Sequence, residues 1–192
     1  MENNIAETIL LIIILILILI SAIIFLASFI FAALSAAPWL PTNRRQRRRL
    51  IELISLKPGQ IVYDLGCGDG AVLFSLADKY SEAKFMGFEV SLFPYLIAIF
   101  RKFLRYNKYK NVSIKYKDFF KQDVREADLI FIFLTTKCYP RLINKLPEEI
   151  KENCLVVVEA WPLPDLEPIN YIKEKGFMSL YFYQGAQFKN NS

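Results

Sequence analysis

The sequence V-Y-D-L-G-C-G-D-G, residues 62–70, carries three glycines at alternate positions. A largely apolar run over residues 60–65 leads into it, and a helix-compatible segment over residues 71–80 follows it. A strand, a glycine-rich turn and a helix in this order are typical of nucleotide-binding α/β domains. Glycine allows a sharp turn and lets a ligand approach the bare backbone, while the free N–H groups of the following helix face that ligand.

The spacing of the glycines indicates which ligand. The dinucleotide fingerprint is G-x-G-x-x-G, whereas Gly66, Gly68 and Gly70 follow G-x-G-x-G, with Asp64 two residues before the first glycine. This variant resembles motif I of the class I S-adenosylmethionine (SAM) methyltransferases, in which the turn passes under the zwitterionic methionine part of SAM. Asp64 and Asp69 would be poor neighbours for a pyrophosphate. The alternative is an ordinary strand-to-helix turn without a ligand.

A second acid ends the next predicted strand. The segment A-K-F-M-G-F-E, residues 83–89, ends in Glu89, which lies 23 residues after Gly66. An acid about 20 residues beyond the first glycine meets a ribose in this architecture, and a carboxylate accepts hydrogen bonds from both ribose hydroxyls. The alternative is a solvated glutamate at a strand end.

The rest of the chain alternates between strand-like and helix-like segments. Further strands are predicted over 112–116, 128–134, 154–159 and 177–183, and helices over 92–106, 141–152 and 170–175. The apolar residues of the segment 92–106 are dense, and we expect them to be buried against the sheet. The fold class is therefore α/β, with a mostly parallel, Rossmann-like class I methyltransferase sheet covered by helices on both faces and preceded by one N-terminal transmembrane helix.

The resemblance also implies the cofactor-binding residues. It places Asp64, Gly66, Cys67, Gly68 and Gly70 on the methionine side of a SAM pocket and Glu89 at the ribose. In this family an acid after the third strand reaches the adenine amino group and an apolar neighbour flanks the ring. Those two residues are Asp118 and Phe119 here.

The N-terminal segment is long and uncharged. No charged residue occurs from Thr8 to Asn43. As a helix, Ile9–Leu34 would run roughly 39 Å, which exceeds the ~30 Å hydrocarbon core of a bilayer. The competing reading is a cleaved signal peptide, but the apolar run is longer than a signal segment needs and its N-terminal flank carries Glu2 and Glu7 without Lys or Arg. We therefore expect a transmembrane anchor over residues 1–37.

Charge then predicts the orientation of the anchor. All 24 Lys and Arg lie after Asn43, and five of the first six residues after it are arginines. The positive-inside rule places that side in the cytoplasm, so the N-terminus faces out and the protein is single-pass. We expect the arginines to act mainly as a topology signal, with contact to anionic headgroups as a by-product. Without them the domain has no strong basic field, so we expect no nucleic-acid partner.

Two further segments are expected between the anchor and the glycine turn. Pro38–Thr42 predicts a stiff connector with Trp39 at headgroup level, and Thr42 is a candidate N-cap for a basic helix that ends near Leu56. Residues 38–57 thus form a juxtamembrane connector and helix, and residues 58–192 form the methyltransferase domain. The chain has no histidine and only three cysteines, without a C-x-x-C pair, so we expect no metal site.

A narrower resemblance covers most of the chain. A membrane helix, P-W-L-P-T, a basic helix and then K-P-G-Q-I-V-Y-D-L-G-C-G-D-G and G-F-E are similar to the membrane-anchored protein-lysine methyltransferases related to the ATP synthase c-subunit lysine N-methyltransferase. This resemblance implies SAM-dependent methylation of a lysine in a membrane protein. Pro94 departs from the pattern, because it follows Glu89 by five residues where about three are expected.

The acceptor side is less defined in sequence. Tyr139, Trp161 and Pro162 follow the fourth and fifth predicted strands, whose carboxyl ends border the ligand crevice in such sheets, and we expect them to be acceptor-pocket walls. Ordinary core or loop packing is the alternative. Glu159, at the end of the fifth strand, is a candidate catalytic residue that takes the lysine proton or attracts the lysine ammonium.

Three other functions stay open at this level. A membrane-tethered SAM enzyme can methylate a lipid headgroup or a small lipophilic molecule instead of a protein. A non-catalytic binding module would hold SAM, or nothing, and scaffold partners. An NAD-dependent oxidoreductase fits the glycine spacing poorly.

Overall fold

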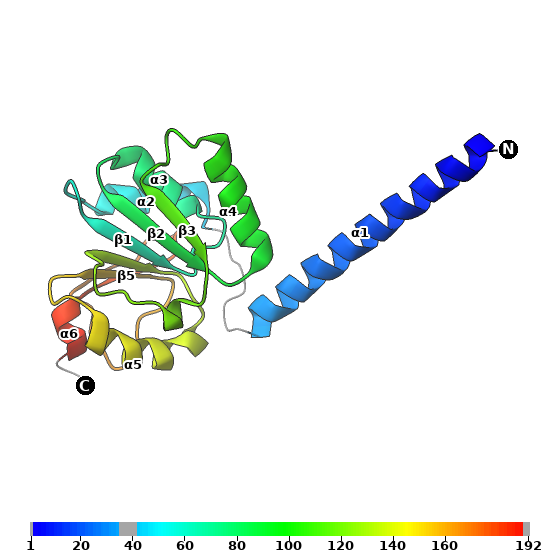
Figure 1. Cartoon of the computed structure of the whole chain (residues 1–192). Coiled ribbons are helices and arrows are strands. Elements are labelled where there is room, and N and C mark those ends of the chain that lie inside the picture. The colour runs from blue at the N-terminus through cyan, green and yellow to red at the C-terminus, as the bar shows by residue number, and fades with distance from the viewer. Residues whose placement is uncertain (1, 35–41, 190–192) are drawn as a thin grey trace.

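The computed structural model describes residues 2–34 and 42–189 (Figure 1). A single long helix, α1 (Glu2–Leu34), projects from an α/β domain that contains the remaining elements. Within α1 the segment Ile5–Ala27 is long and apolar enough to cross a membrane, and its side chains are exposed. Most of the predicted connector, including Trp39, lies outside the described residues.

The domain is built on one mixed sheet of seven strands in the order β3-β2-β1-β4-β5-β7-β6. The first five strands pair in parallel, and β7 and β6 add to the β5 edge in antiparallel pairing. This is the predicted fold class. The strands are β1 (Ile61–Leu65), β2 (Lys84–Glu89), β3 (Val112–Tyr116), β4 (Leu129–Ile132), β5 (Leu155–Glu159), β6 (Asn170–Ile172) and β7 (Leu180–Gln184).

Helices cover both faces of this sheet (Figure 1). They are α2 (Arg44–Leu53), α3 (Ala71–Lys79), α4 (Leu92–Leu104), α5 (Tyr139–Glu149) and α6 (Gly185–Lys189), with short 3₁₀ helices η1 (Phe119–Lys121) and η2 (Thr136–Cys138). The predicted helix over 170–175 is wrong. Its first three residues form β6, because they pair with β7 from Asn170 opposite Phe182 to Ile172 opposite Leu180.

Each face of the sheet has its own apolar core. Side chains such as Val62, Phe131 and Val157 pack with α2 and α3 on one face. The alternate residues of the same strands, such as Ile130, pack with α5 and α6 on the other. The central strands are therefore apolar on both sides, as expected for parallel strands covered by helices.

Helix α4 departs from the sequence expectation. Only Pro94 and Ala98 of this helix are buried. Five of its large side chains are exposed and form what we call the outer face of α4, which consists of Phe93, Leu96, Phe100, Phe103 and Leu104. The expectation that its apolar residues are buried against the sheet is wrong for these five, because the helix packs on the core through its other side, with Ala98, Tyr95 and Ile99.

Helix α2 belongs to the packed domain. Its Leu50 is buried in the α2–α3 core, and the Gln46 amide pairs with the backbone of Met178 beside β7. Its N-cap is Asn43 rather than the predicted Thr42, because the Asn43 side chain accepts a hydrogen bond from Gln46 N at 2.9 Å. These contacts favour counting α2 with the domain, although the division of the chain at residue 57 stays a prediction.

The arginines of α2 are not equivalent. Arg49 is buried, with its guanidinium 4.8 Å from the centre of the Phe177 ring and 3.2 Å from the Glu174 carboxylate. Arg47 donates to Ser75 and to the Thr42 carbonyl. Arg44, Arg45 and Arg48 are exposed. Two of the five arginines predicted as a topology signal therefore also hold α2 on the domain.

Candidate active site

The glycine turn has the conformation that its sequence requires. Gly66 has φ +84° and Gly70 has φ +71°, in the left-handed region that favours glycine. A Cβ on Gly66 would lie 2.7 Å from Leu134 Cδ2, and one on Gly70 would lie 2.8 Å from the Phe74 ring. The turn is therefore closed to larger residues, and its backbone is held tightly between β1 and α3.

The turn is fastened to the end of β2. The backbone N–H groups of Gly66 and Cys67 both donate to the Phe88 carbonyl, at 3.0 and 2.9 Å. The Cys67 thiol is buried against Gly87, where an added Cβ would lie 2.6 Å from Cys67 Sγ. Only the backbone of Cys67 is thus available to a cofactor, and the need for glycine at position 87 was not recognised from the sequence.

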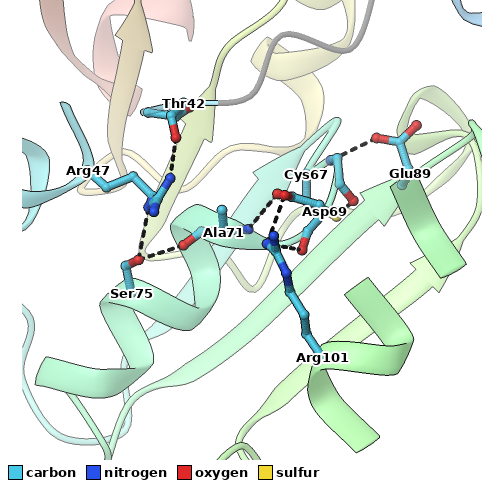
Figure 2. A network of polar contacts seen from close by, with 9 residues as sticks. Thr42, Arg47, Cys67, Asp69, Ala71, Ser75, Glu89 and Arg101 are labelled. Carbon is cyan, nitrogen blue, oxygen red and sulfur yellow. Dashed lines mark hydrogen bonds and ion pairs between the residues drawn. The ribbon is translucent and has the colours of Figure 1, made fainter. Parts of the chain in front are cut away.

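Glu89 is positioned by backbone donors. Its carboxylate accepts hydrogen bonds from Gly68 N at 2.8 Å, Val90 N at 2.9 Å and Ser91 N at 2.6 Å (Figure 2 shows the contact toward the turn). Burial raises the pKa of Glu89, and these hydrogen bonds act in the opposite direction. The Ser91 side chain also hydrogen-bonds to Glu89, so the roughly four acceptor positions of this carboxylate are already used, and its contact with a ribose stays a prediction.

An arginine of α4 holds the acid inside the turn. Arg101 Nη1 lies 2.8 Å from Asp69 Oδ2 and 3.2 Å from the Asp69 carbonyl oxygen, while Asp69 Oδ1 accepts a hydrogen bond from Ala71 N (Figure 2). Asp69 is thereby neutralised and aligned with the start of α3. Sequence reasoning missed Arg101, since no local pattern links it to a residue 32 positions earlier.

Two further acids lie on the same face of the sheet. Asp64 is on β1 and Glu159 ends β5, with β4 between the two strands. Because side chains alternate along a strand, Asp64 points the same way as Val62, and Glu159 the same way as Val157, toward α2 and α3. The fold thus brings Asp64, Glu89 and Glu159 to one face at the carboxyl ends of their strands.

These carboxyl groups are buried and costly to ionise. Asp64 is 3% exposed, and burial, followed by the charges of Glu89, Glu159 and Asp69, raises its pKa well above the ordinary value. Glu159 is 0% exposed, and burial raises its pKa to about 7. The Gln46 amide acts in the opposite direction on the pKa of Glu159, but the hydrogen bonds of this amide go to the backbone of Met178.

The unsatisfied carboxylate suggests what binds here. Within the described residues, neither carboxylate oxygen of Glu159 has a hydrogen-bond partner. A cation bound near these acids would favour their charged forms and offset the burial penalty. SAM carries an ammonium and a sulfonium, and a lysine acceptor carries an ammonium, so the residues present fit a cationic cofactor and substrate. In the described part of the chain, no group of His, Cys, Asp or Glu residues could hold a metal ion.

The predicted adenine residues lie next to each other after β3. The Asp118 carboxylate caps η1 by accepting a hydrogen bond from Phe120 N at 3.0 Å. Phe119 is buried in the α5-side core, and its ring centre lies 4.2 Å from that of Phe120. The contacts of Asp118 and Phe119 with adenine stay predictions, and a buried Phe119 can reach the ring only by its edge or its backbone.

The loop after β5 is held in a fixed shape. Ala160 has φ +79°, a conformation that a non-glycine residue adopts only when its surroundings impose it. The Tyr139 hydroxyl donates to the Trp161 carbonyl at 3.0 Å, and Leu163 N donates to the Tyr183 hydroxyl at 2.8 Å. Tyr139 is itself buried, which favours support of the loop over contact with an acceptor.

Trp161 and Pro162 are exposed at the start of this loop. Trp161 keeps 43% of its surface accessible. They directly follow Glu159, so they border the same strand end. As walls of an acceptor pocket they stay a prediction, now with a loop rigid enough to support them.

A family model described as "ANTKMT methyltransferase domain" matches residues 64–170. The match begins at Asp64, includes Glu89, Asp118 and Glu159, and covers more than half of the chain. The chain belongs to this methyltransferase family. The predicted resemblance to protein-lysine methyltransferases is therefore confirmed.

Individual relatives agree with the family. A protein-lysine N-methyltransferase of Saccharolobus islandicus (strain REY15A) is 32% identical over 160 residues, which are 79% of this chain and 96% of that protein. The adenine nucleotide translocase lysine N-methyltransferase of Mus musculus is 28% identical over 138 residues, 71% of this chain and 58% of that protein. The ATP synthase c-subunit lysine N-methyltransferase of Xenopus laevis is 24% identical over 156 residues, 81% of this chain and 66% of that protein.

A solved structure confirms the fold. An RNA methyltransferase from Salinibacter ruber, in complex with S-adenosyl-L-homocysteine, superposes with a TM-score of 0.69 at 22% identity, covering 76% of this chain and 93% of that one. The ANTKMT-family chain is thus a SAM-dependent methyltransferase with a Rossmann-like sheet. The binding-module and oxidoreductase interpretations of the sequence are set aside, because the matching family is a methyltransferase domain and the three relatives are lysine N-methyltransferases.

Proposed function

We propose that this protein is a membrane-anchored enzyme that transfers the SAM methyl group to a lysine side chain of a membrane protein, close to the cytoplasmic surface. The observation that carries this proposal is the contact between α1 and α4. The rings of Phe25 and Phe93 are 5.0 Å apart in an edge-to-face arrangement. Phe93 lies only four residues after Glu89, so α1 contacts the domain beside the carboxyl end of β2, where the candidate active site lies.

The arrangement of the whole chain supports a site near the bilayer. The parallel strands point toward the side of the domain on which α1 ends (Figure 1). Phe25 belongs to the segment Ile5–Ala27, which could span a membrane. With that segment in a bilayer, the carboxyl ends of the strands lie beside the point at which α1 leaves it, within reach of a lysine at the edge of a substrate's membrane helix.

The names of two relatives support a membrane-protein substrate. The mouse relative is a lysine methyltransferase of the adenine nucleotide translocase, and the Xenopus relative is one of the ATP synthase c-subunit. Both of those substrates are membrane proteins. A substrate of this kind also accounts for an anchor that keeps the enzyme in the plane of the bilayer.

The orientation of the anchor follows from charge. Arg44, Arg45 and Arg48 remain exposed just after the described gap, while the N-terminal side of α1 carries only Glu2 and Glu7. By the positive-inside rule this places the N-terminus outside and the methyltransferase domain in the cytoplasm, with a single pass. SAM is made in the cytosol, so the cofactor and the domain share a compartment.

The chemistry asks little of the protein beyond binding and alignment. SAM supplies an electrophilic methyl group on a sulfonium that leaves as a neutral thioether. The chain holds the methionine part at Asp64 and the glycine turn, the ribose at Glu89 and the adenine at Asp118. Alignment of the two reactants and exclusion of water then provide most of the rate enhancement.

Glu159 is proposed to prepare the lysine. The lysine ammonium, with a reference pKa near ~10.4, must lose a proton before its nitrogen attacks the methyl carbon. A carboxyl group with a pKa of about 7 is suited to attract the ammonium and to accept that proton near neutral pH. Trp161 and Pro162 would enclose the lysine stem and keep the amine dry, which favours its neutral form.

A labelling assay tests the function. Membranes from a strain that lacks the gene are incubated with the full-length protein and SAM carrying a labelled methyl group, with Asp64→Ala as the blank. We expect label in a discrete protein band and, by mass spectrometry, on lysine. Label in the lipid phase would instead support a lipid acceptor, and no label above the blank would contradict the proposal.

The role of Glu159 is tested by its amide variant. With the labelled acceptor in hand, turnover of Glu159→Gln is compared with wild type between pH 6 and pH 9 (from about one unit below to about two units above the pKa of Glu159), at saturating SAM. The wild-type rate is expected to rise through pH 7, and this rise should disappear in the variant. Glu148→Gln, on the exposed side of α5, is the matched control. Unchanged turnover of Glu159→Gln at every pH would remove Glu159 from the mechanism.

A further inference from the structure

The outer face of α4 has the wrong polarity for a helix in water. Phe100 is 60% exposed, Phe103 75% and Leu104 63%, and Leu96 is about half exposed. These residues follow a spacing of three and four positions, so they form one continuous stripe along the helix. A contiguous stripe of large apolar side chains on a folded domain marks a surface that contacts a membrane or another protein.

The charges beside this stripe favour a lipid surface. Residues 92–117 contain seven Lys or Arg and no Asp or Glu. Five of these are exposed: Arg101 and Lys108 form ion pairs with Asp69 and Asp78, and the others are Arg105, Lys110 and Lys117. Tyr106 and Tyr116 are exposed in the same segment. An apolar face flanked by cations and tyrosines is the pattern of helices that lie in the interface of an anionic bilayer.

The position of α4 beside α1 decides between a lipid and a protein partner. Phe93 begins the outer face and packs on Phe25 of α1. Phe25 is near the C-terminal end of the segment that could span a membrane. Figure 1 shows α4 on the flank of the domain nearest to α1. The stripe therefore starts where α1 would leave the hydrocarbon region and continues outward from it.

We propose that the outer face of α4 lies in the cytoplasmic leaflet of the bilayer that α1 spans, with Arg105, Lys110 and Lys117 on the lipid phosphates. This inference rests on the membrane anchoring proposed above. It makes α4 a second membrane contact, so the domain is held at two points rather than hinged on one. Because Arg101 of α4 also holds Asp69, the same helix fixes the position of the glycine turn relative to the membrane.

Site-specific fluorescence in proteoliposomes tests the contact. The three native cysteines are buried, so a new surface cysteine takes most of an environment-sensitive label. Full-length Phe100→Cys and Phe103→Cys are compared with Glu148→Cys on the exposed side of α5 and with Ile16→Cys inside α1. The vesicles contain phosphatidylcholine and phosphatidylglycerol with a spin-labelled lipid as quencher.

The proposal expects severalfold stronger quenching at positions 100 and 103 than at position 148, together with quenching at position 16. Quenching at 16 with the α4 labels at the level of 148 would overturn the α4 contact and leave the anchor intact. No quenching at 16 would overturn the anchor and this inference together. An α4 label that is shielded from water but not quenched by lipid would show a protein partner, and would also overturn the proposal. In vesicles of phosphatidylcholine alone, quenching at 100 and 103 should fall, and equal quenching would remove the basic residues from the contact.

Discussion

The two faces of the sheet bury different kinds of side chain. The face under α5 and α6 buries apolar residues and tyrosines whose hydroxyls fasten loops. The face under α2, α3 and α4 also buries Asp64, Glu89 and Glu159. Burial stabilises the first face, whereas the carboxyl groups buried in the second face lower the stability of the fold when they ionise. A bound cationic ligand would offset this cost. One face of the sheet thus supports the loops, and the other carries the acids of the candidate site.

The helices on the two faces differ in the same sense. On α5, Tyr139, Leu142 and Leu146 face the core and polar residues face outward, as in any soluble domain. On α4 the five large apolar residues of the outer face are exposed, and only Pro94 and Ala98 are fully buried. The outer side of α5 is therefore typical of a surface in contact with water, whereas that of α4 is typical of a surface in contact with a membrane or another protein.

The largest effect should separate α5 from α4. Leu142→Ala removes a fully buried side chain and is expected to lower the free energy of unfolding by about 2–5 kcal/mol. Leu96→Ala removes the same atoms from an exposed position and should change it by less than about 0.5 kcal/mol in detergent. Denaturant unfolding of the full-length variants measures both. Similar losses for the two variants would contradict the exposed position of Leu96.

The next effect tests the cost of the buried acids. The pKa of Glu159 is about 7 in the folded protein and 4.5 when unperturbed. The contribution of this carboxyl group to wild-type stability is therefore fully present below pH 4.5 and is lost as the pH rises toward 7. Glu159→Gln lacks this loss and should therefore gain stability over wild type across that window, by as much as about 3 kcal/mol. Thermal unfolding without SAM at pH 5 and pH 8 (roughly the two ends of the window) gives the measurement. A difference between the two proteins that is equal at both pH values would argue against a buried, ligand-free carboxylate.

A smaller effect is expected at the ion pair between α4 and the turn. The Arg101 side chain is 45% exposed, and that of Asp69 is 10% exposed. Arg101→Gln should therefore lower stability by only about 1 kcal/mol, but weaken SAM binding severalfold because Asp69 and the start of α3 lose their fixed position. Calorimetry with SAM measures this change, and Arg101→Lys should restore part of it. Wild-type SAM affinity in Arg101→Gln would mean that the turn holds its shape alone.

The smallest effect should come from the surface of α2. Arg48 and Glu52 form an exposed pair at 3.2 Å with side chains 85% and 63% accessible. Arg48→Gln is expected to change stability by less than about 0.5 kcal/mol. The neighbouring Arg49→Gln removes a buried group that contacts Phe177, Glu174 and Met178, and its effect on thermal unfolding should be clearly larger. Equal effects would contradict the assignment of these two arginines to different environments.

Much of the fold and part of the site could be predicted from local sequence. The glycine turn, the alternation of strands and helices and the acids at the strand ends follow from spacing, because each signal is contained within a few residues. The predicted helix over 170–175 failed, since Asn170–Ile172 pairs with the edge strand β7, and Tyr171 and Ile172 are of types that are enriched in strands. The acceptor residues Tyr139, Trp161 and Pro162 follow the right strands, but their packing shows a supported loop with one buried tyrosine.

The sequence alone determined the features that depend on short-range chemistry. Three alternate glycines predict the turn, the long apolar run Ile9–Leu34 predicts a helix, and short alternating or continuous apolar runs predict strands. Only the tertiary structure decided which residues meet across long separations. It placed Arg101 beside Asp69, brought Glu159 onto the face of Asp64, buried Arg49 and left five large apolar side chains of α4 exposed. Periodicity shows which side chains share a helix face, but the direction of that face is fixed by how the helix packs on the sheet.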